Sequence, residues 1–297
     1  MTSLVLTQPR HLQRLSDIAL LLVAVVWGTS YGVAKGALAF YPVLGFLAVR
    51  FSLTFLLLSP ALWAATPRQR QHALIAGLPL GGMMLAIFLC ETYGVAHTQA
   101  SNAAFLISLC VVFTPFVEWW MLGRKPAPAI FVFAAVSLVG AGLLSGGLES
   151  QFGYGDALML CAAMLRAVGV CQTSKWTQGR DAPALALTAV QSGVIAVGCL
   201  ALGLASQEGL PALPSSPAFW QMVAYLVIGC TVFAFFAQNW ALKHSSPSRV
   251  TLLTSSEPAF GALFAVLWLG ESLSFTAWVG GGLIVASALW VCACRAD

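Results

Sequence analysis

Two charged residues, Arg166 and Glu257, stand deep inside long apolar stretches of this sequence. A charge in such surroundings is costly, so each is expected to face a polar interior or a wet cavity. A guanidinium placed there can recognise a carboxylate or a phosphate, and a buried carboxylate can take up and release a proton. The alternatives are structural: Arg166 forms an ion pair or reaches out to water, and Glu257 neutralises Arg166 or bonds freed backbone groups. We predict that both residues belong to a binding site.

A second pair of opposite charges, Arg50 and Glu91, falls in two other apolar stretches at matching depths. These depths allow a mutual ion pair, so we predict a structural bridge between them. Proline supplies another irregularity, because it lacks a backbone N–H and frees a carbonyl in the preceding turn, which suits a hinge. The predicted hinge residues are Pro115 and Pro258, the second of which directly follows Glu257.

Aromatic residues form a third group of candidates. Trp27 and Tyr31 are four residues apart and therefore share one face of a helix. With Tyr93, Phe235 and Trp240 they can surround a flat or cationic ligand, although aromatic residues also serve as lipid-facing or interfacial filler. Further candidates for polar contacts with a cavity are Asn102, Gln172, Gln191, Gln238 and Asn239. The predicted substrate-binding residues are therefore Trp27, Tyr31, Tyr93, Asn102, Arg166, Trp240 and Glu257.

The elements that must hold these residues follow from an extreme composition. Hydrophobic residues make up 59% of the 297 residues, charged residues only 8%, and the mean hydropathy is +0.87. A soluble protein carries about 25% charged residues, so this chain cannot cover a water-facing surface and is predicted to be a polytopic membrane protein. Ten stretches near the ~20 residues needed to cross a bilayer are predicted as transmembrane helices: 17–36, 43–63, 73–95, 98–120, 127–146, 155–175, 183–205, 217–241, 248–269 and 275–294.

The two halves of the chain resemble each other. A shift of 147 positions aligns His97 with His244 and Ser108 with Ser255, and a register of about 139 aligns Trp27 with Arg166. Each half then holds five spans, and because five is odd, the second copy must be inverted in the bilayer. We predict an all-α fold of two inverted-topology five-helix repeats, residues 1–150 and 151–297, with a site between them.

Basic residues predict the orientation. Arg and Lys gather in the loops on the side of the N-terminus, whereas the opposite loops carry Glu149, Glu208 and Glu271. Positive loops stay in the cytoplasm, so both termini are predicted to be cytoplasmic and the protein to lie in the inner (plasma) membrane. Arg10 and Arg14 before an apolar run also fit a signal peptide, but the run is long enough to span and no cleavage site precedes a soluble domain.

Several short motifs resemble those of the EamA-type drug/metabolite transporter (DMT) superfamily. They are Trp27-Gly28-Thr29-Ser30-Tyr31, Ser101-Asn102-Ala103-Ala104-Phe105-Leu106, Gly155-Asp156-Ala157-Leu158, Ser256-Glu257-Pro258 and Leu269-Gly270-Glu271. The resemblance covers nearly the whole chain and implies a ten-helix carrier with a cavity between inverted repeats. Many bacterial members export amino acids, including aromatic ones, or other metabolites. Arg166 departs from the family, since the second repeat often has tryptophan there.

These features favour a secondary exporter of small metabolites, most of all amino acids, working by alternating access. A multidrug or organic-ion exporter and a channel-like permease are the alternatives. Gly153-Tyr154-Gly155-Asp156 resembles a motif of intramembrane aspartyl proteases, but the partner aspartate motif is missing and no enzyme is predicted. The chain has no phosphate-binding loop and no metal-ligand spacing, so we expect no cofactor. The expected partners are a small-molecule substrate and the lipid bilayer, with proton coupling left open, no nucleic acid, and a monomer or weak homodimer.

Overall fold

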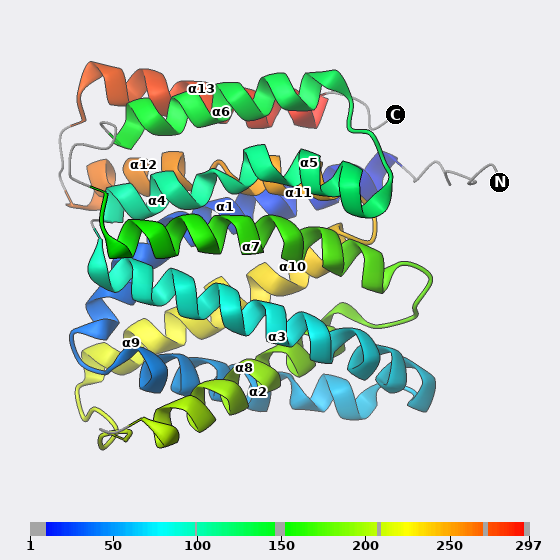
Figure 1. The fold of residues 1–297 in the computed structure, drawn as a ribbon, viewed down its shortest axis with the longest axis vertical. Helices are drawn as coiled ribbons and strands as arrows, with labels where there is room; N and C mark the ends of the chain where they lie inside the picture. Colours follow the sequence, from blue (N-terminus) through cyan, green and yellow to red (C-terminus); the bar gives the residue numbers. More distant parts are fainter. Residues whose placement is uncertain (1–9, 99, 146–151, 207–208, 270–272, 294–297) are drawn as a thin grey trace.

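The computed structural model describes residues 10–98, 100–145, 152–206, 209–269 and 273–293, and every regular element within them is helical (Figure 1). The elements in chain order are α1 (Arg10–Leu38), α2 (Val43–Ala64), α3 (Pro67–His97), α4 (Ala100–Ser108), α5 (Cys110–Leu122), α6 (Pro128–Ser145), α7 (Tyr154–Thr177), α8 (Ala184–Ala205), α9 (Pro217–Tyr225), the π-helix η1 (Leu226–Phe233), α10 (Ala234–Ala241), α11 (Pro247–Thr254), α12 (Glu257–Leu269) and α13 (Phe275–Ala293).

Seven of the described helices are long and apolar enough to cross a membrane: α1, α2, α3, the α4–α5 stretch, α7, α8 and the α9–η1–α10 stretch. Helices α6 and α13 are shorter but also apolar. Helices α11 and α12 follow each other with two residues between them. The chain is therefore an all-helical membrane protein, as its composition predicts.

Proline sets the start of several helices. Helices α3, α6, α9 and α11 each begin at a proline, which needs no hydrogen-bond partner for a backbone N–H in the first turn. Asp156 stabilises the start of α7, where one of its carboxylate oxygens accepts from the backbone N–H of Gly153 at 2.9 Å. The most extensive helix contacts join elements far apart in the chain: α2 with α8, α3 with α7 and α6 with α13.

The helices form one bundle whose long axes run roughly in the same direction (Figure 1). Helices α6 and α13 pack together along one side, and α2 and α8 pack together along the other. Between these two pairs lie α1, α3, α7, α10 and the short helices α4, α5, α11 and α12. The first turn of α1 and the last turn of α13 are at the same end of the bundle.

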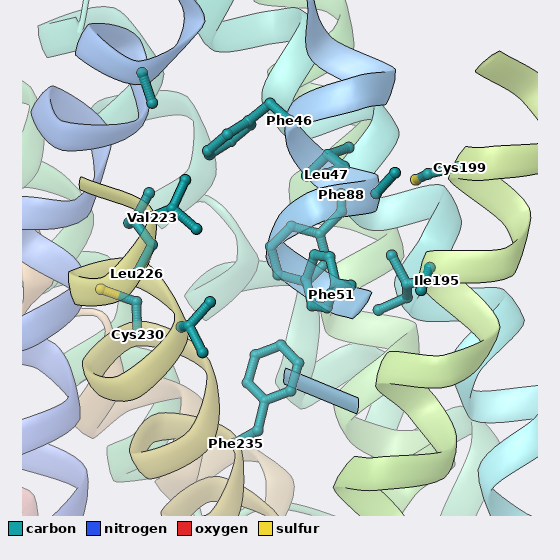
Figure 2. Packing of buried hydrophobic residues seen from close by; sticks show 14 of the residues in the cluster. Phe46, Leu47, Phe51, Phe88, Ile195, Cys199, Val223, Leu226, Cys230 and Phe235 are labelled. Atoms are coloured by element: carbon teal, nitrogen blue, oxygen red, sulfur yellow. The ribbon is translucent and has the colours of Figure 1, made fainter. Parts of the chain in front are cut away.

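A buried aromatic cluster joins α2, α3, α8 and α10 (Figure 2). The ring of Phe51 meets that of Phe88 edge-on at 4.7 Å between centroids, and Phe88 lies 5.8 Å from Phe235. Phe46 and Ile195 extend the same apolar contact along α2 and α8. Edge-on ring pairs add stability beyond the area they bury. This cluster packs α2 and α8 against α3 and α10.

Glycine allows α1 and α12 to touch. A Cβ atom added at Gly28 would lie 2.5 Å from the carbonyl oxygen of Glu257 and 2.7 Å from the backbone nitrogen of Gly261. These are backbone atoms, which cannot turn aside. Gly32, one turn further along α1, has no such neighbour within 4 Å. The two backbones therefore approach closely at Gly28 and not at Gly32.

Two carboxylates hold the beginning of α11. Arg249 donates to Asp17 through Nε at 3.1 Å and Nη2 at 2.7 Å, and both side chains are buried. Glu118 accepts from the backbone N–H of Ser248 at 2.9 Å and from its hydroxyl. Helix α1 begins at Arg10, so Asp17 lies inside it and not at its start. Its partner is Arg249, because a buried carboxylate needs a counter-charge.

We expect Gly28→Ala to lower the free energy of unfolding by about 1–3 kcal/mol, because the new methyl group overlaps fixed backbone atoms. Gly32→Ala is the matched control, and we expect it to be neutral or to stabilise by up to ~1 kcal/mol, since alanine favours the helix. Thermal unfolding of the purified protein in mild detergent measures both. Equal midpoints for the two variants would contradict the close approach of α1 and α12.

Candidate functional site

Two helices are interrupted at the centre of the bundle. The first break separates α4 from α5 at Leu109, and the second separates α11 from α12 at Ser255 and Ser256. The shift of 147 positions that aligns the two halves carries Leu109 onto Ser256. At each break a serine hydroxyl donates to the carbonyl three residues earlier: Ser108 to Phe105 at 2.6 Å, and Ser255 to Leu252 at 2.8 Å. The two breaks therefore share this local hydrogen bond.

The predicted hinge prolines differ in their relation to these breaks. Pro258 is the second residue of α12, directly after the interruption, where its missing N–H leaves the carbonyl of Thr254 without a helical partner. Pro115 lies inside α5, six residues beyond the break at Leu109. Hinge motion at either proline stays a prediction.

Arg166 and Glu257 meet between the two breaks. The Nη2 atom of Arg166 lies 3.6 Å from Oε2 of Glu257, and the exposed fractions of the two side chains are 16% and 4%. The other carboxylate oxygen of Glu257 is buried without a hydrogen-bond partner among the described residues. The carboxylate thus neutralises Arg166, which is one of the two alternatives that the sequence allows. A small hollow beside the pair is lined by Ile107, Ser108, Cys110, Arg166, Thr254, Ser255, Glu257 and Pro258.

Trp27 stacks on this ion pair. The guanidinium carbon of Arg166 lies 4.5 Å from the centroid of the Trp27 ring, a distance at which the ring face attracts a cation. The indole N–H donates to the carbonyl of Cys230 at 2.9 Å. The ring also meets Phe235 edge-on at 6.4 Å. Trp27 therefore belongs both to the site and to the contact between α1 and the α9–η1–α10 stretch.

Cys230 belongs to η1, a π-helix that the sequence does not predict. A π-helix turn hydrogen-bonds five residues back and often occurs at functional sites. Here the hydroxyl of Thr231 donates to the carbonyl of Leu226 at 2.9 Å. No pattern of residue types announces this geometry, because the apolar run from 226 to 233 suits an α-helix equally well.

A hollow beside the ion pair reaches further into the bundle. Its empty space is about 820 Å³, a volume that includes the part open to solvent. Its walls carry charges of both signs among aromatic and apolar side chains. The lining residues are Trp27, Ser30, Tyr31, Ala34, Arg50, Met84, Ile87, Phe88, Glu91, Thr92, Val95, Arg166, Gly169, Val170, Thr173, Phe235, Gln238, Leu242 and Glu257.

Arg50 and Glu91 both line this cavity, but they are not bonded to each other. The salt bridges within 4.0 Å in the described part of the chain are Arg166–Glu257 and Arg249–Asp17. Arg50 instead donates through Nε to the hydroxyl of Thr231 at 3.0 Å. The predicted structural bridge is absent from this conformation, because the Arg50 side chain is held against η1.

The remaining predicted site residues are not brought together. Tyr93 and Trp240 do not line the cavity; their backbone carbonyls lie 2.8 Å from Nδ1 of His97 and His244, one helical turn further on. Tyr31 does line it. The side chain of Asn102 lies outside the described residues.

Three further polar residues line the cavity without having been predicted to do so. They are Ser30 on α1, Thr92 on α3 and Thr173 on α7. An isolated polar residue in an apolar helix gives no sign of the direction it faces. The sequence therefore holds no signal that separates these three from polar residues elsewhere in the bundle.

We expect Arg166→Gln and Glu257→Gln each to lower the free energy of unfolding by about 2–3 kcal/mol. This is less than the ~3–5 kcal/mol of a fully buried pair, because Arg166 reaches the cavity. The double variant should lose less than the sum of the two, since it leaves neither charge unpaired. Unfolding in mild detergent measures this cycle. Strictly additive losses would contradict a direct interaction between the two side chains.

Broken membrane helices that meet around a charged central cavity are typical of secondary transporters. The model of the EamA-like transporter family matches the chain twice, over residues 14–146 and 153–293. The chain therefore belongs to the EamA-like transporter family of the drug/metabolite transporter superfamily.

Named relatives agree with this family. An uncharacterized transporter of Archaeoglobus fulgidus is 26% identical over 93% of this chain and 85% of its own length. The uncharacterized inner membrane transporter YedA of Escherichia coli is 26% identical, covering 92% of this chain and 89% of YedA. A probable terminal-alkyne amino-acid exporter of Streptantibioticus cattleyicolor is 24% identical over 92% of both chains. A protein of known crystal structure shares the fold, with a TM-score of 0.73 at 17% identity over 92% of this chain and 94% of that one.

Proposed function

We propose that this protein is a secondary-active transporter of the inner membrane that exports small metabolites, in particular amino acids including aromatic ones. The observation that carries the proposal is the central cavity, where Arg50, Arg166, Glu91 and Glu257 stand among aromatic rings. An aromatic amino acid offers a carboxylate, an ammonium group and a ring, and each has a complement in this lining. The relative named as a probable amino-acid exporter supports the same substrate class.

We further propose ten spans in two inverted five-helix repeats, with both termini in the cytoplasm. The double family match supports the repeats. The equivalent helix breaks at Leu109 and Ser256 support them as well. So does the stacking of Trp27 on Arg166, because these two residues are 139 positions apart and align when the first helices of the two halves are superposed. The spans beyond the seven long helices would be α6, α13 and the α11–α12 stretch. The start of α1 and the end of α13 lie at the same end of the bundle, which suits an even number of spans.

In the proposed cycle the two repeats rock against each other around the cavity, and the broken helices absorb the movement. Helix α12 carries Glu257 at its first turn, so a movement at the break shifts the carboxylate relative to Arg166. Protonation of Glu257 would weaken its attraction to Arg166 and couple the break to a proton gradient. The sequence holds no phosphate-binding loop, so an ion gradient or the gradient of the substrate supplies the driving force.

The anchoring of the α11–α12 stretch supports movement at its break. Arg249, bonded to Asp17, holds the start of α11, and the close approach of Gly28 to Gly261 holds α12 against α1. The interruption at Ser255 and Ser256 lies between these two fixed points. A rearrangement of the stretch is therefore concentrated at the residues that directly precede Glu257.

A transport assay in liposomes tests the function. We expect uptake of a radiolabelled aromatic amino acid such as L-phenylalanine to saturate with concentration and to show counterflow, because a carrier exposes its site to one side at a time. Competition by other amino acids and by organic cations separates an amino-acid exporter from a multidrug exporter. Flux that rises linearly with concentration and lacks counterflow would instead favour a channel-like permease.

The role of Glu257 is tested by the pH dependence of the same uptake. If Glu257 carries the coupled proton, Glu257→Gln should transport at a rate that no longer changes between pH 5 and pH 8, where wild type does change. Asp156→Asn is a matched control, because it removes a carboxylate that caps α7 and does not line the cavity. If the transport rate of Glu257→Gln varied with pH as the wild-type rate does, proton carriage by this residue would be ruled out.

A further inference from the structure

The four charges that line the cavity differ in how they are satisfied. Arg166 and Glu257 neutralise each other, and Arg166 is also covered by the ring of Trp27. Arg50 has no carboxylate within 4.0 Å in the described residues, although only 6% of its surface is exposed. An arginine so deeply buried normally has a bonded counter-charge. Arg50 is thus the cavity's unsatisfied cation.

The local contacts of Arg50 hold one edge of its guanidinium and leave the tip available. Its Nε donates to the hydroxyl of Thr231, which in turn donates to the carbonyl of Leu226 within η1. Its guanidinium carbon lies 5.3 Å from the ring centroid of Phe51 and 5.4 Å from that of Phe88. These contacts engage one N–H and the faces of two rings, whereas a guanidinium has five N–H donors. The donors of the two terminal nitrogens remain for a ligand.

Glu91 is the matching anion. It lines the same cavity from α3, and the described residues supply it with no hydrogen bond or ion pair. It interacts electrostatically with Arg166 and, more weakly, with Arg50, and the gap to each is wider than a salt bridge. Two opposite charges that face one hollow without touching are complementary to a ligand that carries both charges on neighbouring atoms.

On the basis of the proposed function, we propose that Arg50 and Glu91 read the two charged ends of a zwitterionic substrate. Arg50 binds the carboxylate through its terminal nitrogens, and Glu91 binds the ammonium group. The rings of Trp27, Phe88 and Phe235 form the apolar wall for the substrate side chain. The ion pair of Arg166 and Glu257 stays intact while substrate binds. The assignment moves carboxylate recognition from Arg166, where the sequence directs it, to Arg50.

The contact with Thr231 gives Arg50 a second consequence. Because Thr231 sits in η1, a carboxylate that pulls on the guanidinium acts directly on the π-helix. The same helix accepts the indole N–H of Trp27 at Cys230. Substrate charge and substrate ring would therefore be sensed by one irregular segment.

Binding to the purified full-length protein in detergent, measured by calorimetry with four related probes, tests the assignment. The probes are L-phenylalanine, which carries both charges, 2-phenylethylamine, 3-phenylpropanoate and uncharged 2-phenylethanol. We expect wild type to bind L-phenylalanine at least tenfold more tightly than any of the others. Arg50→Gln should weaken L-phenylalanine and 3-phenylpropanoate about 10- to 100-fold and leave 2-phenylethylamine unchanged. Glu91→Gln should weaken L-phenylalanine and 2-phenylethylamine by a similar factor and leave 3-phenylpropanoate unchanged.

The unchanged probe in each variant reports that the site is folded. Arg50→Lys keeps the charge, but an ammonium group lacks the planar set of donors with which a guanidinium can bond Thr231 and a carboxylate at the same time. We therefore expect Arg50→Lys to weaken the binding of the two probes that carry a carboxylate, by a smaller factor than Arg50→Gln. Arg180→Gln is the matched control, because Arg180 bonds the carbonyl of Trp176 at the end of α7 and does not line the cavity. It should bind all four probes like wild type.

Three outcomes would overturn the assignment. The first is that Arg50→Gln or Glu91→Gln weakens the binding of all probes equally. The second is that Arg166→Gln selectively weakens the binding of probes with a carboxylate, whereas Arg50→Gln does not. The third is that wild type binds a singly charged probe as tightly as L-phenylalanine. If wild type takes up L-phenylalanine with saturation in liposomes and one of these three outcomes is observed, the proposed function stands and only the roles of Arg50 and Glu91 are contradicted. Absence of saturable amino-acid uptake by wild type would instead contradict the proposed function itself.

Discussion

Hydrocarbon solvates neither a charge nor a free backbone group, so each such group in a membrane span must face a partner or a polar cavity inside the bundle. The ion pair of Arg166 and Glu257 is the centre of that arrangement. It lies where α4–α5 and α11–α12 are both interrupted. The polar surroundings that stabilise the two charges also stabilise the backbone groups at the interruptions. A break in a lipid-facing helix would expose carbonyls to acyl chains. Here residues from both breaks line one hollow inside the protein.

The same residues hold the bundle together and form the site. Trp27 donates to a carbonyl of the π-helix, meets Phe235 edge-on and covers the Arg166 guanidinium. Phe88 belongs to the aromatic cluster of Figure 2 and also lines the cavity. A site built in this way is preorganised, because its walls are fixed by contacts that the fold needs in any case. Its shape is then sensitive to any relative movement of α1, α3 and η1.

Composition and motifs are enough to identify the class of this protein. An apolar chain with so few charges can form only a membrane-embedded helical fold, and the motifs around Trp27 and Glu257 point to the family whose model matches. The sequence also predicts that Trp27, Tyr31, Arg166 and Glu257 share one site, and all four line the cavity. A charge or a polar face in an apolar span must turn toward a polar interior, and this constraint brings the four residues together; their role in substrate binding stays a prediction. Ten spans and inverted repeats remain predictions that the equivalent helix breaks support.

The pairing of the charges could not be read from the chain, because it depends on how the helices pack. The sequence gives the depth of a residue along its helix, but it does not give the rotation of that helix relative to its neighbours. Arg50 and Glu91 have matching depths, yet Arg50 bonds Thr231 of the π-helix. The cavity lies on the face of α3 that carries Glu91 and Val95, four residues apart. Tyr93, midway between them, therefore lies on the opposite side of α3, and only the packed bundle shows which side faces the cavity.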